Sequence, residues 1–261
     1  MINPVSEPSD FHVQQLTTAA LWRQAAALYR SVFGYQDASY GINPRLLASL
    51  AGNGGSVVGA LDSRQRLVAF AYGFLGTDGE HTYHYSQAAV VAPAVQDRGL
   101  GRRLKLAQRE VALRSGATSM RWSYDPLLTR NAHFNLDVLN ATGVGFHPDM
   151  YGDDGSDRIM INWDLTRDPD ARAEPEQLPE LGRSDWGEIV TESGADPDRI
   201  VLAVPSDIVG LRIADPDRAT AIAVAVRERL ADIFGRGHQA VSCRATGNTA
   251  GYIFRPAGHH V

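Results

Sequence analysis

The stretch VVAPAVQDRGLGRRLKLAQREVALRSG, residues 90–116, constrains the fold more than any other part of the chain. An apolar run ends near a proline, two glycines follow with one residue between them, and a basic segment begins there. The apolar run predicts a buried strand. The spacing of Leu100, Leu104, Ala107 and Val111 predicts a helix that buries one face. The chain must therefore place a strand, a glycine-bearing loop and a packed helix in direct succession.

The start of this helix has the chemistry of an anion site. The first backbone N–H groups of a helix have no partner inside it, and they lie at the positive end of the helix dipole. Gly99 and Gly101 have no side chain to block a phosphate, and Arg98 and Arg102 add positive charge and forked donors. We therefore expect this N-terminus to receive a diphosphate. The helix stays basic further along, through Arg103, Lys105, Arg109 and Arg114.

Other readings of this loop fit less well. A P-loop needs G-x-x-x-x-G-K-[ST], and this loop has neither the length nor the Lys-Ser/Thr pair. A dinucleotide fingerprint needs a third glycine where Leu104 stands. The chain has a formal net charge of −5, and no aromatic residues are interleaved with the basic ones of the helix, so we expect no nucleic-acid partner.

Composition bounds the remaining possibilities. With 261 residues, 44% hydrophobic and 21% charged, the chain is long enough for one large or two small globular domains. Cys243 is the only cysteine, which excludes an internal disulfide and a thiolate zinc site and favours a reducing compartment. No apolar run reaches about 18 residues, and residues 1–10 lack the apolar core of a signal peptide. We expect a cytoplasmic protein with no metal and no membrane partner; His259 and His260 alone make a weak metal tag.

The periodicity predicts the element order βααβββαβαββ as far as residue 165, with a mixed sheet and helices on both of its faces. Residues 167–183 are rich in proline and charge and predict a linker. A strand at 200–204, a long helix at 216–234 and strands at 240–245 and 250–254 follow. We therefore expect two domains, residues 1–165 and 166–261. The expected helices of the first are 17–33, 44–50, 99–115 and 129–140, and its strands are 11–16, 55–61, 67–75, 82–91, 118–123, 143–151 and 158–165.

The segment Gln96-Asp97-Arg98-Gly99-Leu100-Gly101 matches Q/R-x-x-G-x-G/A and resembles the acyl-CoA pyrophosphate loop of the Gcn5-related N-acetyltransferases, the GNAT family. The element order up to residue 165 is also similar to the GNAT fold. The segments LKLAQREVALRSGA, SYDPLLTRNAHFNLDVL, DMYG and SDRIMINWDL resemble a GNAT subgroup with a C-terminal extension. The resemblance covers most of the chain and is weaker beyond residue 165.

This resemblance implies an α/β (α+β) GNAT fold: a mixed, mostly antiparallel central sheet flanked by helices, plus a smaller C-terminal α+β extension. It implies acetyl-CoA or another acyl-CoA as co-substrate and a small-molecule amine as acceptor; an association of some relatives with N-acylated amino acids hints at the acceptor. The extension would shape the acceptor pocket or a homodimer interface. The cofactor-binding residues that it implies are Ala89, Val90, Val91, Gln96, Arg98, Gly99, Leu100, Gly101, Arg102 and Asn131.

The catalytic residues are less constrained. Glu80, His81 and His84 lie on or just before the fourth strand and are candidate bases for deprotonating the amine. Many GNAT enzymes carry a tyrosine that protonates the leaving thiolate, but Val138 and Leu139 stand at that place. Tyr124 or Tyr151 are the substitutes. Asp125 is a candidate anchor for the acceptor amine, and an ordinary turn residue is the alternative.

Two functions stay open at this point. The first is an acyl-CoA-dependent N-acyltransferase that transfers the acyl group directly in a ternary complex. The second is a protein that binds acyl-CoA but has lost catalysis, which the missing tyrosine favours. Turnover of the thioester separates the two.

Overall fold

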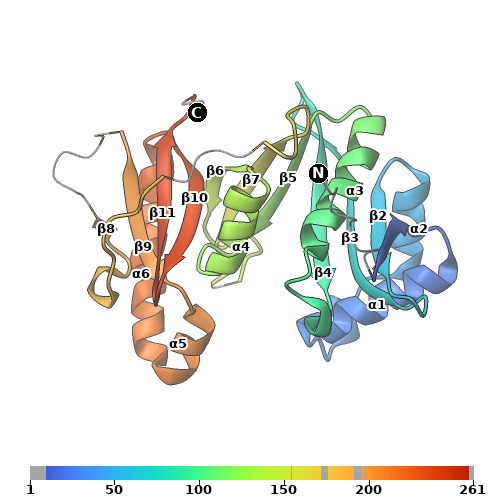
Figure 1. Ribbon diagram of the computed structural model, residues 1–261, viewed down its shortest axis with the longest axis horizontal. Helices are drawn as coiled ribbons and strands as arrows, with labels where there is room; N and C mark the ends of the chain where they lie inside the picture. Colours follow the sequence, from blue (N-terminus) through green and yellow to red (C-terminus); the bar gives the residue numbers. More distant parts are fainter. Residues whose placement is uncertain (1–9, 154, 172–175, 191–195, 197, 259–261) are drawn as a thin grey trace, which may run out of the picture. The chain divides into compact units, whose positions relative to one another are not determined.

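The computed structural model describes residues 10–153, 155–171, 176–190, 196 and 198–258 (Figure 1). The contacts divide the chain into two compact units, residues 1–120 and 121–261. Each unit is described by itself below. The boundary expected at residue 165 is not where the contacts divide, because β6 (Thr142–His147) pairs with β10 (His238–Thr246) inside the second unit.

The first unit is an antiparallel sheet with helices on both faces, as expected for this part of the chain. Its strands pair in the order β1-β2-β3-β4. They are β1 (His12–Gln15), β2 (Ser56–Leu61), β3 (Leu67–Thr77) and β4 (Thr82–Val91). The helices are α1 (Ala19–Phe33), α2 (Pro44–Gly52) and α3 (Leu100–Arg114), with short 3-10 turns η1 (Ala38–Tyr40) and η2 (Pro93–Val95).

Local signals set the ends of these helices. The Thr18 side chain caps α1 by accepting a hydrogen bond from the Leu21 N–H at 3.3 Å. Gly34 ends α1 in the left-handed region, at φ 69°. Asn43 caps α2 directly before Pro44, the residue type favoured at a first helical position. The sequence predictions for α1 and α2 are confirmed within two residues at each end.

Two apolar clusters fill the space on the two faces of this sheet. Side chains of α1 and α2 pack with Val57, Phe70, Tyr72 and Val90 on one face. On the other face, α3 packs against β2 and β3 (Figure 1). The stripe predicted for α3 is confirmed, because Leu100, Leu104 and Val111 are buried there with Ala107 beside them.

Strand β4 contains a β-bulge. Tyr72 of β3 lies opposite Ala88, but the next residue, Gly73, lies opposite Ser86. Gln87 is therefore an extra residue on β4. The bulge changes which positions face α3: His84 and Ser86 point to α3 before it, and Val91 packs on the α3 side after it.

The second unit is a second run of strands in the order β5-β7-β6-β10-β11-β9-β8. The pairs β7–β6, β6–β10, β10–β11, β11–β9 and β9–β8 are antiparallel. The remaining elements of the unit are β5 (Ser119–Tyr124), which begins two residues before the unit boundary, α4 (Thr129–His133), the π-helical η3 (Phe134–Val138), β7 (Arg158–Asp164), η4 (Arg183–Asp185), β8 (Ile189–Val190), β9 (Ile200–Pro205), α5 (Ile208–Ala214), α6 (Pro216–Gly235) and β11 (Thr249–Pro256).

Helix α6 contacts β6, β9 and β10 with the stripe that the sequence predicted. Its buried side chains are Ala219, Ile222, Val226, Leu230 and Ile233. Helix α5 was not expected from the sequence. Asp207 caps it by accepting a hydrogen bond from the Gly210 N–H at 2.8 Å.

The helix expected at 129–140 is interrupted. Helix α4 ends at His133 and continues as the π-helical η3. Asp137 explains the change, because its carboxylate accepts hydrogen bonds from the Ser242 hydroxyl at 2.6 Å and from the Cys243 N–H at 3.0 Å. These contacts tie this turn to β10. Within the parts of the chain that the structure describes, no helix has both the length and the apolar composition needed to cross a membrane.

Candidate functional site

The loop between β4 and α3 has an unusual backbone. Asp97 and Gly99 both lie in the left-handed region, at φ 62° and 70°. Gly99 is the N-cap of α3, a position that normally has extended backbone and a capping side chain. Here no side chain caps the helix among the described residues. A Cβ added at Gly99 would meet nothing within 4 Å. The N-terminus of α3 is therefore open, which fits the approach of a diphosphate.

The arginines of this loop have different surroundings. Arg98 is more than half exposed; one of its guanidinium nitrogens lies 3.7 Å from the Asp10 carboxylate, and the guanidinium lies 5.8 Å from the Phe11 ring centroid. Arg103 donates from its guanidinium to the Phe11 carbonyl at 2.8 Å, which ties α3 to the start of β1. Arg98 thus keeps an exposed charge beside the open helix end, and Arg103 acts as a structural tie.

The end of β4 carries the residues expected to hold the pantetheine arm. The Ala89 side chain is exposed, Val90 is buried among side chains from α1 and α2, and Val91 packs on the α3 side. Gln96 is exposed and donates from its amide to the Val91 carbonyl at 3.4 Å. Their roles toward acyl-CoA stay predictions.

A buried polar network lies under the middle of α3. Lys105 Nζ donates to Ser86 Oγ at 2.9 Å, and that hydroxyl donates to Gln108 Oε1 at 2.9 Å. Gln108 Nε2 donates to Ser56 Oγ at 2.9 Å, and Ser56 Oγ lies 2.8 Å from His84 Nε2. All five side chains are at most 3% exposed. The network joins β2, β4 and α3.

The network corrects the expectation that Lys105 adds to the basic surface of α3. The side chain is buried, and desolvation lowers its pKa well below the usual value of a lysine. The sequence signal was present but easily missed. Lys105 and Gln108 lie three residues apart beside the apolar stripe, and Ser56 begins an otherwise apolar strand.

The surroundings of His84 disfavour the expected role as a base. The ring is fully buried, and burial together with the nearby Lys105 lowers its pKa to about 4. Ser56 Oγ accepts a hydrogen bond from Gln108, and its hydrogen bond with His84 Nε2 can run in either direction, depending on the ring tautomer. Nδ1 has no hydrogen-bond partner. Because the ring is 0% exposed, neither nitrogen is accessible to a substrate amine in this structure. Its catalytic role stays a prediction that this geometry weakens.

The other candidate bases lie in the turn between β3 and β4. Glu80 is exposed, and its N–H donates to the Asp78 carboxylate at 3.2 Å. His81 is exposed in the same turn. Both residues lie outside the buried network, and the role of Glu80 stays a prediction.

Tyr124 and Asp125 lie at the end of β5 in the second unit. Tyr124 is 5% exposed, and burial raises the pKa of its hydroxyl. Burial also raises the pKa of the Asp125 carboxyl, which accepts a hydrogen bond from the Leu127 N–H at 2.9 Å. This hydrogen bond is typical of a turn residue, and the role of Asp125 toward an acceptor amine stays a prediction. A guanidinium nitrogen of Arg212 lies 4.0 Å from the Asp125 carboxylate.

The remaining expected residue, Asn131, is exposed on α4. Asn135, one turn later, is buried and accepts a hydrogen bond from the Trp122 indole N–H at 3.1 Å. Tyr151, the alternative acid, is more than half exposed, and its hydroxyl lies 3.4 Å from the Ser123 hydroxyl. Leu139, at the place of the missing tyrosine, is buried. His259 and His260 lie outside the described residues.

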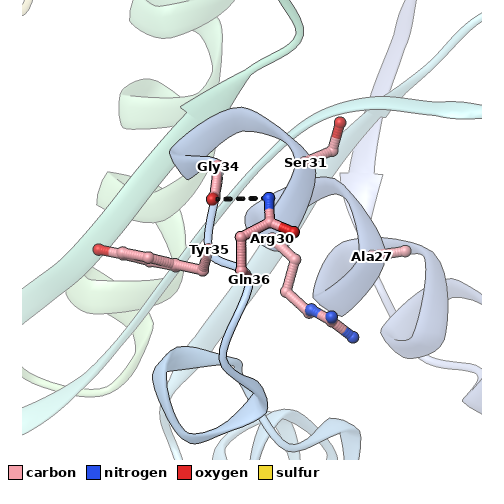
Figure 2. Close-up of a pocket in the computed structure, with 6 residues that line it drawn as sticks. All are labelled: Ala27, Arg30, Ser31, Gly34, Tyr35 and Gln36. Atoms are coloured by element: carbon pink, nitrogen blue, oxygen red, sulfur yellow. Dashed lines mark hydrogen bonds between the residues drawn. The ribbon is translucent and has the colours of Figure 1, made fainter.

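A pocket of about 340 Å³ lies at the C-terminal end of α1 (Figure 2). Tyr35 is its aromatic wall, and this ring stacks on Phe33 and Tyr40 at centroid distances of 5.5 and 5.4 Å. The pocket contains none of the residues expected to bind acyl-CoA. Its lining residues are Ala27, Arg30, Ser31, Gly34, Tyr35 and Gln36. In the described part of the chain, no group of three or more His, Cys, Asp or Glu side chains is placed to hold a metal ion.

Comparison with known proteins gives matches only among solved structures. No protein-family model matches the chain, and no curated protein matches its sequence. The structure of yncA from Salmonella typhimurium, with its cofactor acetyl-CoA, is 17% identical at a TM-score of 0.49, over 64% of this chain and 100% of that one. Aminoglycoside 6'-acetyltransferase type Ii is 18% identical at a TM-score of 0.47, over 60% and 99%.

A third match is a structure from Desulfovibrio desulfuricans described as an acetyltransferase of the GNAT family. It is 14% identical at a TM-score of 0.47, over 59% of this chain and 99% of that one. All three TM-scores lie below 0.5.

Proposed function

We propose that this chain is an acyl-CoA-dependent N-acyltransferase, which moves an acyl group, acetyl by default, to a primary amine of a small molecule such as an amino acid. One observation carries the proposal: the open, uncapped N-terminus of α3 follows a bulged strand through a loop with two left-handed residues. The motif that resembles a GNAT pyrophosphate loop falls on this loop. Sequence motif and backbone geometry therefore support the same site.

The residues of the loop fit a diphosphate. The N–H groups at the start of α3, from Gly99 to Arg102, would donate to its oxygens, and the Arg98 guanidinium would add charge. When bound, acyl-CoA supplies an activated thioester. The acceptor nitrogen attacks the thioester carbon, a C–N bond forms, the C–S bond breaks, and the amine loses one proton while the thiolate can take one up. Because a thiol pKa is near 8.5, the thiolate leaves readily without a dedicated acid.

The second candidate is a protein that binds acyl-CoA without transferring the acyl group. Two observations favour it: His84 is fully buried with a lowered pKa, and Tyr124 is buried with a raised pKa. Glu80 and Tyr151 are the exposed candidates that an active enzyme would have to use instead. In either case residues 166–261 would serve the acceptor or a second copy of the chain, and we propose no membrane or nucleic-acid partner.

Thermal melts with CoA, acetyl-CoA and succinyl-CoA test the binding step. A ligand at a hundred times its dissociation constant adds about 2.7 kcal/mol, or roughly 5 to 10 °C for a chain of this size. Arg98→Glu and Gly101→Asp should abolish the shift. Arg114→Glu is the matched control, because it makes the same charge change at the other end of α3. Release of free thiol from acetyl-CoA in the presence of an amine mixture then separates enzyme from binding protein. No shift with any ester, in a folded protein, refutes both.

A further inference from the structure

Burying the polar network under α3 costs free energy that apolar side chains at the same place would not cost. Its five polar side chains lie beside a cluster of alanine, valine and leucine on the same face of the sheet. Apolar residues of similar shape often stabilise a core more than a buried polar network does. A fully bonded network, in contrast, specifies one arrangement of the groups that it joins. Fold stability alone therefore does not explain why β2, β4 and α3 meet through hydrogen bonds.

Three of the four hydrogen bonds of the network run in one direction along the chain of side chains. Lys105 donates to Ser86, so Ser86 can pass its own hydrogen to Gln108 Oε1, and Gln108 then donates to Ser56. If the Gln108 amide were turned over, the Ser86 hydroxyl would lose the Gln108 oxygen as its acceptor. Lys105 and His84 thus lie at opposite ends of one chain of four hydrogen bonds.

The network also lies at a particular place on β4. Ser86 is the last residue before the bulged Gln87, and it is the residue of β4 that both Lys105 and Gln108 hold. Gly73, opposite Ser86, leaves room for this arrangement: a Cβ there would lie 2.6 Å from His84 Nε2. Beyond the bulge, the side chains of Gln87 and Ala89 are exposed. The same helix that carries the glycine loop at its start therefore fixes the strand at its bulge.

We propose that Lys105 and Ser86 are positioning residues that hold β4 at its bulge against α3. They would keep the segment 87–89 in the arrangement that receives the acyl-CoA arm while the start of α3 receives the diphosphate. The inference rests on the proposed function for its ligand. The tie between helix and strand rests on the hydrogen bonds alone.

Amide hydrogen exchange and CoA titration of the full chain test this. Ser86→Ala and Lys105→Met should speed exchange of the amides at 87–89 about tenfold and weaken CoA binding about tenfold. Lys105→Met should have both effects while global stability is not lost. A residue with a merely structural role would lower global stability as well. Val111→Ala is the control: it lies in the apolar stripe of α3, so it should lower global stability and leave local exchange and CoA affinity at the wild-type values.

The two levels of the inference fail differently. If exchange at 87–89 in Ser86→Ala and Lys105→Met follows global stability, as in Val111→Ala, the positioning role is overturned whatever CoA does. If the wild type binds no CoA, the proposed function fails, and faster local exchange in the two variants would still establish the tie between α3 and β4. Should Ser86→Ala fail to fold, Lys105→Met alone decides the outcome by the same two readouts.

Discussion

The histidine under α3 should make the fold sensitive to mild acid. His84 is fully buried, and its pKa is lowered to about 4 from the ordinary 6.5 by burial and by the nearby Lys105. Between these two values the unfolded chain binds a proton that the folded chain does not. Stability conferred by the neutral ring is therefore complete above about pH 6.5 and is lost as the pH falls toward 4. Integrated from pH 8 to pH 5, the loss is about 2 kcal/mol.

The assay is denaturant unfolding of wild type and His84→Gln at pH 8 and pH 5. Glutamine keeps an acceptor for Ser56 but does not titrate in this range, and the contributions of the carboxylates cancel between the two proteins. The wild type should lose about 2 kcal/mol more than the variant on going to pH 5. Val111→Ala, which removes apolar packing but no titratable group, should keep the wild-type pH dependence. Equal losses in wild type and His84→Gln would refute the reasoning, because they would mean that the buried ring accepts a proton as readily as in water.

Three further outcomes follow from other parts of the structure. Because the unfolded chain binds a proton at Lys105 that the folded chain lacks, the free energy of unfolding should rise with pH between pH 9 and 10. Lys105→Met should reduce this slope by up to about 1.4 kcal/mol per pH unit in denaturant unfolding. An unchanged slope would mean that the buried amine is charged. Gly73→Ala should cost about 2–3 kcal/mol in thermal melts, because its Cβ would meet the Tyr85 carbonyl and the His84 ring. A loss under 0.5 kcal/mol would contradict that crowding. Arg227→Met should lower the free energy of unfolding by about 1 kcal/mol, because the partly exposed guanidinium forms ion pairs with Asp149 and Asp157 of the β6–β7 loop. If the ion pairs cause this loss, it should shrink in high salt.

The sequence predicted the helix stripes and the glycine loop because both depend on local spacing. The period of Leu100, Leu104 and Val111 fixes which face of α3 is buried, and the same holds for α6. The open N-terminus follows from residues that are neighbours in the chain. These features need no knowledge of distant contacts, so they were available from the sequence alone.

Features that depend on distant partners were not predicted. Lys105 lies on a helix rich in basic residues, but its side chain is buried and donates to the Ser86 hydroxyl, which in turn donates to the Gln108 amide. His84 alternates with apolar residues as a solvent-facing strand residue would, yet Gly73 makes room for its ring under α3. The π-helical turn after α4 depends on Asp137 reaching β10, more than a hundred residues away. Periodicity describes one element at a time and does not contain these pairings.

The domain boundary shows the same limit. A change in composition after residue 165 predicted a separate extension. Strand pairing then joined Ala240 of β10 to Gly143 of β6, inside the part that was expected to be a domain of its own. Glycine at 143 permits this contact, because a Cβ there would lie 2.9 Å from the Cβ of Ala240. Composition marks a linker, but it does not show which strand the chain pairs with afterwards.

The measurement that tests the central claim most directly is a titration of the isotope-labelled full chain with CoA, followed through its backbone amide signals. The account predicts that the largest shifts fall on the amides of residues 99–102 at the start of α3, with further shifts at 87–89. Gly101→Asp should remove the shifts at 99–102 while the rest of the spectrum shows a folded protein. Shifts confined to other residues, or none at saturating CoA, would contradict the account and leave the two glycines as a device that only starts a helix.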